Sequence, residues 1–312
     1  MGLIKLMTLT ILTPVYNRKW GVERLFASLR KQTRKDFEWL IVDDGSTDDI
    51  GSSIPKIMSE ADFPVHFIRK ENGGKHTALN AGIVSIDTPL TFIVDSDDTL
   101  TEDAVEIILK YHQKYKSHQG LCGYSFLQIF PDGKINGKLF EPDEKVGSYI
   151  DVRINGDDTH ADKAEVFYTR CLKEFPFPEY SGEKFLGEDV VWVPMGRKYS
   201  MVHINRAICQ SEYLDDGLTK NRRKNNIASP RGCMHRAAMY MEKDIKLRYR
   251  IKGALQFSVY GQFVGYKLGS LLNMTEHKML VTMFYPMAAV LYLKWKRACM
   301  ISNSQLGSAQ ER

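Results

Sequence analysis

The first third of the chain alternates between short apolar segments and amphipathic segments, and this alternation constrains the fold more than any other feature. Apolar runs rich in Val, Ile, Leu and Phe predict four buried strands, at residues 9–15, 37–42, 65–69 and 90–94. After the first run, Val22, Leu25, Phe26 and Leu29 have the i, i+3, i+4, i+7 spacing of one helix face. Repeated β-α units with short links predict a parallel sheet with right-handed crossovers.

The pattern changes after about residue 118. Turns such as Pro131-Asp132-Gly133 between short apolar runs predict antiparallel ribbons from about residue 120 to 147. We expect helices over 161–172 and 188–199, and a last strand over 202–209. The expected fold is therefore α/β, with a Rossmann-like, mostly parallel sheet, helices on both of its faces, and a helical C-terminal tail.

Polar clusters follow each of the four strands predicted in the first third. In parallel sheets ligands bind beyond the carboxyl ends of the strands, so these clusters are expected at one edge of the sheet. The clusters are Tyr16-Asn17-Arg18, Asp43 to Ser46, Glu71 to His76, and Asp95 to Asp98. No GxGxxG turn follows the first strand, which leaves a dinucleotide-binding fold without support.

The last cluster carries three carboxylates within four residues, on Asp95, Asp97 and Asp98. Carboxylates this close repel one another, and a divalent cation that bridges them to phosphates would offset the repulsion. The alternative is a solvated acidic turn that caps a helix, because Thr99-Leu100-Thr101-Glu102 has the pattern of a helix start.

Five motifs in this order and spacing resemble family 2 glycosyltransferases of the GT-A fold, which transfer a sugar from a nucleotide diphosphate. They cover roughly residues 8 to 200 and are Thr13-Pro14-Val15-Tyr16-Asn17, Ile41 to Asp48, Asn72-Gly73-Gly74, Val94 to Asp98, and Phe185 to Asp189. The resemblance implies the GT-A fold and a nucleotide-sugar donor, for which we expect a UDP-sugar.

The resemblance also implies which residues bind the donor. Residues Thr13, Pro14, Tyr16 and Asn17 would form the wall beside the base, and Asp44 would accept the N3–H of uracil. A turn or helix-capping role is the alternative for Asp44.

The phosphate side of the donor site is expected in the loop after the third strand. There Gly74 would let the backbone approach the nucleotide closely, with Lys75 or His76 near phosphate. A plain tight turn is the alternative for this loop.

By the same resemblance Asp95 faces the ribose and the metal, Ser96 lies in the donor site, and Asp97 ligates Mn²⁺ or Mg²⁺. Asp98 would assist directly or through water. An inverting transfer also needs a base to take the proton of the acceptor hydroxyl. We favour Asp189 for this role, and Glu188 stays open. The alternative for both residues is that they are acids at a helix N-terminus with no catalytic role.

The C-terminal region has a different composition. Between residues 220 and 252 eleven Lys and Arg stand against two acids, and residues 279–293 are almost wholly apolar. Fifteen apolar residues are too few to span a bilayer and suit a segment in the interface of an anionic membrane, with Trp295 at headgroup level. A helical hairpin packed on the catalytic domain, or a homodimer contact, is the alternative. We expect no nucleic-acid partner, since no binding motif is recognised.

The domains expected are a GT-A catalytic domain over 1–215, with a nucleotide-binding half at about 1–118 and an acceptor half at about 119–215, and a basic, apolar helical region over 216–312. The stretch at 212–221 is expected to form a lid over the donor, with a solvated loop as the alternative.

Scattered cysteines indicate a reducing compartment, and residues 1–7 show no signal-peptide pattern. We expect a cytoplasmic protein, peripheral at the inner face of the bacterial plasma membrane.

Processive members of the resembled family carry a QxxRW motif, and the segment that starts at Gln210 does not match it. We therefore expect one sugar to be added per encounter. The acceptor would be a glycan or a polyprenyl-diphosphate-linked sugar in surface polysaccharide synthesis. The alternatives are a teichoic-acid or protein glycosyltransferase, and a catalytically silent partner that binds nucleotide sugars.

Overall fold

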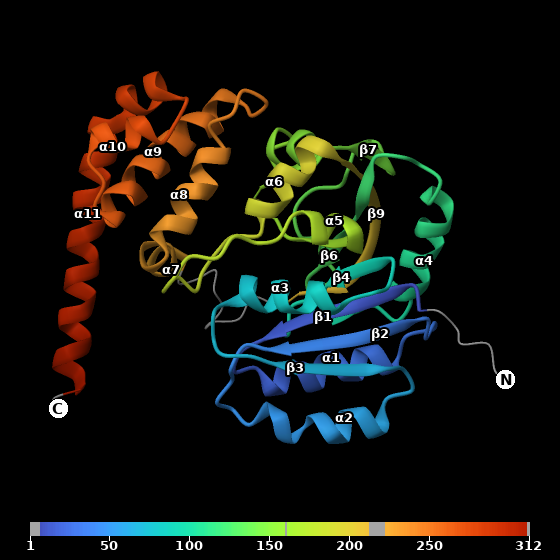
Figure 1. Cartoon of the computed structure of the whole chain (residues 1–312). Coiled ribbons are helices and arrows are strands. Elements are labelled where there is room, and N and C mark those ends of the chain that lie inside the picture. Colours follow the sequence, from blue (N-terminus) through green and yellow to red (C-terminus); the bar gives the residue numbers. More distant parts are fainter. Residues whose placement is uncertain (1–6, 160, 212–221, 311–312) are drawn as a thin grey trace. The chain divides into compact units, whose positions relative to one another are not determined.

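The computed structural model describes residues 7–159, 161–211 and 222–310, with side chains up to residue 298 (Figure 1). The chain divides into two compact units. The sheet unit comprises Met1–Phe177 and Val191–Leu214, and the helical unit comprises Pro178–Val190 and Asp215–Arg312. The segment that carries the two candidate bases thus belongs to the helical unit.

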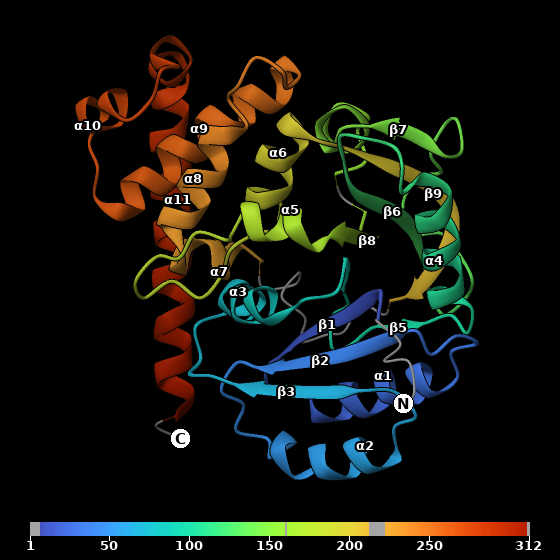
Figure 2. The same cartoon turned by 45° about the vertical axis from the view of Figure 1, so that its right-hand side comes forward.

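The first half of the sheet unit is the predicted parallel sheet, and its four strands have the order β3-β2-β1-β4. The strands are β1 (Leu9–Val15), β2 (Phe37–Asp43), β3 (Val65–Arg69) and β4 (Leu90–Ile93). Helices α1 (Lys19–Arg30) and α2 (Ile54–Glu60) lie on one face and α3 (Lys75–Ser85) on the other, with a short 3₁₀ turn η1 (Ile50–Ser52) before α2 (Figures 1 and 2). Every residue of β1 is buried, which explains its continuous apolar run.

The strand register places the polar clusters together, as the parallel arrangement requires. At the carboxyl end Val15 pairs with Asp43, and Asp43 pairs with Arg69. On the other side of β1, Leu12 pairs with Ile93, so the turn after β4 begins level with the last residues of β1. The predicted convergence at one sheet edge is confirmed.

The second half of the sheet is mixed, because β8 runs antiparallel to both β4 and β6. Its order continues β4-β8-β6-β9-β5, and β7 pairs with β9. The elements are β5 (Thr99–Leu100), α4 (Ala104–Tyr115), β6 (Leu121–Ile129), β7 (Lys145–Gly147), the π-helical η2 (Ile150–Ile154), β8 (Lys163–Tyr168), α5 (Thr169–Glu174), α6 (Asp189–Lys198) and β9 (Ser200–Gln210).

Two local predictions were wrong in this half. Residues 161–172 form a strand followed by a short helix, because β8 fills the gap between β4 and β6 and pairing overrides the helix-forming residues Ala, Lys and Glu at its start. Thr99 and Leu100 do not start a helix but pair with Gln210 and Cys209 of β9. The α4 helix begins later, at Ala104. The turn at Asp95–Asp98 is therefore held between two strands and does not cap a helix.

The helical unit has its own apolar core. Its helices are α7 (Arg222–Ala228), α8 (Pro230–Met239), α9 (Leu247–Val264), α10 (Leu268–Asn273) and α11 (Lys278–Gln310). Buried side chains of α8, α9 and α11, among them Met234, Phe257 and Val281, pack together. No helix in the described part of the chain is long and apolar enough to cross a membrane. Of the predicted lid over 212–221, every residue lies outside the described ranges.

Candidate functional site

A tight turn at the end of β4 presents the predicted metal-binding carboxylates. The Asp98 N–H donates to the Asp95 carbonyl oxygen over 3.0 Å. The side chains of Asp95 and Asp97 are 43% and 29% exposed, whereas Asp98 is buried. Two carboxylates thus face solvent and the third faces inward, where its Oδ2 lies 3.7 Å from the Cys209 sulfur.

Helix α1 supports this turn through direct backbone contact. A Cβ on Gly21 would lie 2.3 Å from the Ser96 carbonyl oxygen, so only glycine allows α1 to come this close. From the same helix the Arg24 guanidinium donates to the Asp97 carbonyl oxygen. Ser96 is buried, which leaves its backbone as the part that shapes the turn.

Basic side chains from two other clusters reach the exposed carboxylates. The Lys75 ammonium at the start of α3 lies 2.5 Å from Asp95 Oδ1, and the Arg18 guanidinium after β1 lies 3.7 Å from Asp97 Oδ2. The loops after β1, β3 and β4 therefore meet in one charged site. Both cations can also bind phosphate oxygens, Arg with a planar fork of donors and Lys as a point charge.

The carboxylates nevertheless carry excess negative charge. Burial raises the pKa of Asp97, and the nearby Asp95 carboxylate raises it further, against the lowering effect of Arg18. Burial raises the pKa of Asp98 well above its ordinary value, with Asp95 and Asp97 adding to the shift. A divalent cation would relieve this repulsion, so the donor set fits one.

The described residues contain no group of three or more His, Cys, Asp or Glu side chains placed to hold a metal ion by themselves. Asp95 and Asp97 form a pair, and a pair suits Mg²⁺ or Mn²⁺ that takes its other ligands from a substrate diphosphate and water. Such a cation would be bound together with the nucleotide.

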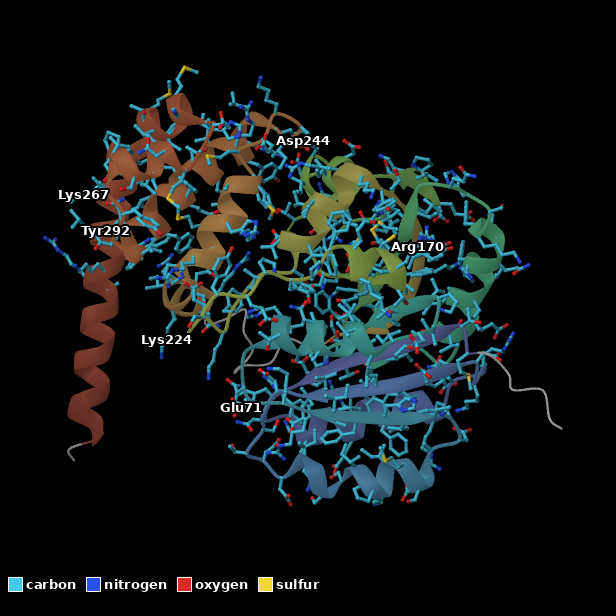
Figure 3. All side chains as sticks on the ribbon, in the orientation of Figure 1. Glu71, Arg170, Lys224, Asp244, Lys267 and Tyr292 are labelled. Atoms are coloured by element: carbon cyan, nitrogen blue, oxygen red, sulfur yellow. The ribbon has the colours of Figure 1, made fainter. Side chains whose placement is uncertain are left out.

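Asp44 is buried at the end of β2 and organises the loop after β3. Its carboxylate accepts hydrogen bonds from Lys70 Nζ (2.9 Å), the Asn72 side-chain amide (3.1 Å) and the backbone N–H groups of Gly73 (3.0 Å) and Gly74 (2.7 Å). These four bonds use the acceptor sites of an ionised carboxylate. Gly74 has φ of 97°, a conformation that favours glycine. It directly precedes α3, so the loop that Asp44 holds also positions Lys75, the first residue of that helix. Figure 3 labels Glu71 in the same loop.

The residues predicted for the base wall divide into two groups. Tyr16 is 49% exposed at the end of β1 and is available to a ligand. Thr13 and Pro14 are buried, and the Thr13 hydroxyl accepts a hydrogen bond from the Trp39 indole over 3.0 Å inside the core. Asn17 joins the loops after β1 and β2, because its Oδ1 accepts the Thr47 N–H over 2.7 Å. Tyr16 and Asn17 are thus the exposed residues of this group.

Asp189 belongs to the helical unit, is the first residue of α6, and is held by two partners from α8 and the turn after it. Arg236 Nε lies 2.6 and 2.7 Å from the two carboxylate oxygens, and the Tyr240 hydroxyl donates to Oδ2 over 2.6 Å. Burial alone would raise the pKa of Asp189, but Arg236 and Tyr240 outweigh it and lower the pKa. Glycine at position 187 leaves space for the Asp189 carboxylate, because a Cβ there would lie only 2.9 Å from Asp189 Oδ1.

Sequence reasoning gave no role to Lys70, Arg18, Arg236 or Tyr240. Lys70 directly precedes the predicted polar cluster at Glu71–His76 and Arg18 lies within the cluster after the first strand, so a search for cations at the same sheet edge would have found them. Arg236 and Tyr240 stand 47 and 51 residues from Asp189, and no local pattern links them to it.

Comparison with known proteins agrees with these motifs. Residues 10–138 match the model of the family described as glycosyl transferase family 2. Over this segment the chain is therefore similar to family 2 glycosyltransferases. The predicted family resemblance is therefore confirmed, and the turn at Asp95–Asp98 lies inside the matched glycosyltransferase segment.

Curated relatives match part of this chain over part of their own length. An uncharacterized glycosyltransferase of Rickettsia felis is 40% identical over 106 residues, which are 34% of this chain and 17% of the relative. The chain thus covers about a sixth of that protein. A Campylobacter jejuni protein named GalNAc(5)-diNAcBac-PP-undecaprenol beta-1,3-glucosyltransferase is 23% identical over 211 residues, 64% of this chain and 62% of the relative.

Solved glycosyltransferase structures share the fold. S. aureus TarS 1-349 in complex with UDP-GlcNAc superposes with a TM-score of 0.57 at 15% identity, over 93% of this chain and 81% of that chain. The mannosyltransferase PcManGT from Pyrobaculum calidifontis, in complex with GDP-Man and Mn²⁺, gives 0.56 at 15% identity, over 97% and 86%. The predicted GT-A fold with a helical C-terminal region is confirmed, with a mixed sheet in its second half.

The raised pKa of Asp98 yields a stability prediction for the sheet unit. A group whose pKa is higher in the folded than in the unfolded chain stabilises the fold at low pH and loses that contribution as the pH rises through the folded pKa. Asp98→Asn removes the charge and should raise the melting temperature near neutral pH in EDTA. The difference from wild type should shrink as the pH is lowered and Asp98 takes up its proton.

Thermal melts at several pH values measure this effect. Glu102→Gln is the matched control, because Glu102 is an exposed acid close in sequence. A melting temperature for Asp98→Asn at or below wild type near neutral pH would show that Asp98 carries no such electrostatic cost.

Proposed function

We propose that this protein is an inverting, metal-dependent glycosyltransferase that moves a single sugar from a UDP-sugar to a glycan or lipid-linked acceptor. One observation carries the proposal. Within the segment that matches the model of glycosyl transferase family 2, the partly exposed carboxylates of Asp95 and Asp97 meet Lys75 and Arg18 at the carboxyl edge of the parallel sheet. This arrangement suits a diphosphate that is bound by Lys75, by Arg18 and by a metal ion.

The uridine end of the donor is proposed to lie against Tyr16 and Asp44. TarS is titled in complex with UDP and with UDP-GlcNAc, which supports UDP, while the GDP-Man complex of PcManGT is the reason to test GDP as well. Because all acceptor sites of Asp44 are used, the N3–H of uracil would replace one present donor. Lys70 and Asn72 are the donors that can leave by side-chain rotation, whereas the Gly73 and Gly74 amides are fixed in the loop.

Asp95 and Asp97 are the residues proposed to hold Mn²⁺ or Mg²⁺, with Asp98 assisting. When bound, the cation would supply positive charge against the negative charge that develops on the departing diphosphate. Lys75 and Arg18 would bind the diphosphate oxygens and orient the donor. Their present ion pairs show that both side chains reach this place.

Asp189 is proposed as the base. The acceptor hydroxyl would attack the anomeric carbon, its proton would pass to an Asp189 oxygen, and the bond to the diphosphate would break on the opposite side, which inverts the anomeric centre. Arg236 and Tyr240 would hold the carboxylate in one orientation and ionised at neutral pH. The lowered pKa makes Asp189 a weak base, so the proton would move once attack has acidified the hydroxyl. Glu188 directly precedes it and is the competing candidate.

The acceptor is proposed to belong to bacterial surface polysaccharide synthesis at the inner face of the plasma membrane. The support is the match to the Campylobacter relative, whose name includes an undecaprenol-linked acceptor, and to the Rhizobium meliloti succinoglycan biosynthesis protein ExoW. The single-sugar outcome rests on the sequence after Gln210.

Asp97→Ala tests the metal site. UDP affinity in Mn²⁺ should fall by about a hundredfold or more, because losing a ligand costs at least as much as losing a group that orients one. The residual binding should no longer respond to EDTA. Isothermal titration of wild type, Asp97→Ala and the exposed control Glu102→Ala measures both effects, and unchanged affinity of Asp97→Ala in Mn²⁺ would refute the assignment.

Asp189→Asn tests the base. Transfer should slow by on the order of a hundredfold or more with UDP binding unchanged, since a positioned base contributes about that much. Tyr240→Phe removes one hydrogen bond that lowers the Asp189 pKa, so the acid limb of kcat against pH should move to higher pH while the plateau stays near wild type.

Glu188→Gln is the matched comparison in the transfer assay. If it slows transfer and Asp189→Asn does not, Glu188 is the base. An acid limb that Tyr240→Phe leaves in place would show that Tyr240 has only a structural contact with Asp189.

A further inference from the structure

Helix α11 carries a row of exposed apolar side chains along one face. The row consists of Met279 (79% exposed), Met283 (63%), Met287 (54%), Val290 (66%) and Leu293 (54%). The spacing of three and four residues keeps them on one side of a helix. No charged residue occurs between positions 279 and 293, so this outward face offers nothing but apolar and weakly polar groups to its surroundings. We call it the α11 stripe.

The opposite face of α11 fixes the helix to the rest of the helical unit. Val281 and Ala288 are completely buried in the core of that unit. Farther along, the Tyr292 ring packs on Phe263 at 4.9 Å between ring centroids, and Trp295 lies 6.0 Å from Tyr260 (Figure 3 labels Tyr292). The α11 stripe is therefore the face that remains after the helix has packed, on a helix held in place by its other side.

Positive charge flanks the α11 stripe. Lys278 precedes it, and the exposed Lys294, Lys296 and Arg297 follow within about one turn. No Asp or Glu occurs anywhere in the 278–310 span of α11. An apolar row ended by cations is the arrangement of helices that lie in the interface of anionic membranes.

We propose that the α11 stripe docks on the surface of an anionic lipid bilayer, with the helix lying flat and its methionines among the upper acyl chains. From residue 279 to 293 the stripe extends roughly 21 Å, less than the about 30 Å of the hydrocarbon core, and no described helix can cross it. The cations at both ends would then face lipid phosphates.

A second copy of the chain fits the α11 stripe less well. Pairing two α11 helices through their stripes would bring together cations from both copies without any carboxylate on either helix to balance them. Like charges set against each other oppose such an interface, whereas anionic lipid neutralises them. Charge thus decides between the two occupants.

The inference concerns a surface other than the candidate nucleotide site, and it stands whether or not the protein transfers a sugar. If both proposals hold, docking would bring the enzyme to the membrane that carries a lipid-linked acceptor. Membrane binding needs no substrate, so its failure would be visible separately from a failure of catalysis.

Co-sedimentation of the full chain with vesicles tests the proposal. The vesicles are phosphatidylcholine alone and phosphatidylcholine mixed with phosphatidylglycerol. Wild type should bind the anionic vesicles in a salt-sensitive manner, and Met283→Glu/Met287→Glu should bind at least about tenfold more weakly. Met58→Glu is the matched control, because Met58 is also an exposed methionine on a helix but lies in the sheet unit.

A second pair of variants tests the charge. Lys294→Gln/Lys296→Gln should weaken binding to anionic vesicles, while the exposed pair Lys31→Gln/Lys138→Gln should not. Melting temperatures near wild type would show that every variant is folded.

Three results would overturn the proposal. Wild type that binds neither vesicle would do so, as would equal binding of wild type and Met283→Glu/Met287→Glu. Sedimentation velocity that shows a wild-type dimer, split by the same two substitutions, would assign the α11 stripe to a second copy instead.

Discussion

Repulsion among the carboxylates of Asp95, Asp97 and Asp98 is the constraint on which the site depends. Burial raises the pKa of Asp97 and Asp98, and repulsion from the neighbouring carboxylates raises it further, so the ionised turn is unfavourable without compensating charge. Positive charge from two neighbouring loops offsets the repulsion, and α1 supports the backbone of the turn by close contact. The proposed ligand, a nucleotide diphosphate with a bound cation, would complete this site.

The other loops of the sheet edge serve the same geometry. Asp44 holds the loop that ends in Gly74, and that loop starts α3 and aims Lys75 at Asp95. Asp44 therefore has a clear role in the protein without any ligand, and recognition of uracil by the same carboxylate requires an exchange of hydrogen-bond donors. The two interpretations of Asp44 made from the sequence, turn organiser and base ligand, are compatible in this way.

The strands β1, β2 and β4 were predictable because strands buried on both faces are mostly apolar, as in β1, whereas the partly exposed β3 was predictable only from its short apolar segment between two polar stretches. The strand β8 was not, since its first residues form helices well and only its two neighbours in the sheet impose the extended conformation. For the same reason the sheet-edge residues Asp95 and Lys75 could be grouped from the topology, whereas the partners of Asp189 could not, because Arg236 and Tyr240 come from a distant helix and the turn after it.

The composition of the C-terminal region does not determine which of its apolar side chains are buried. The apolar stretch at 279–293 is too short to span a bilayer, as predicted, and Trp295, which was expected at headgroup level, packs on Tyr260 of the helical unit. The preceding aromatic segment, α9, likewise supplies the core of the helical unit through Phe257 and Tyr260. Only burial separates the inward face of α11 from the outward one.

Calorimetric titration of the full chain with UDP and with GDP, first in Mn²⁺ and then in EDTA, tests the central claim most directly. The account predicts binding in the micromolar range that is selective for UDP and is lost when EDTA removes the metal. Selectivity for GDP would change the donor and keep the site. Binding of neither nucleotide, or equal binding with and without metal, would contradict the proposal that the Asp95–Asp98 turn binds a metal–diphosphate complex.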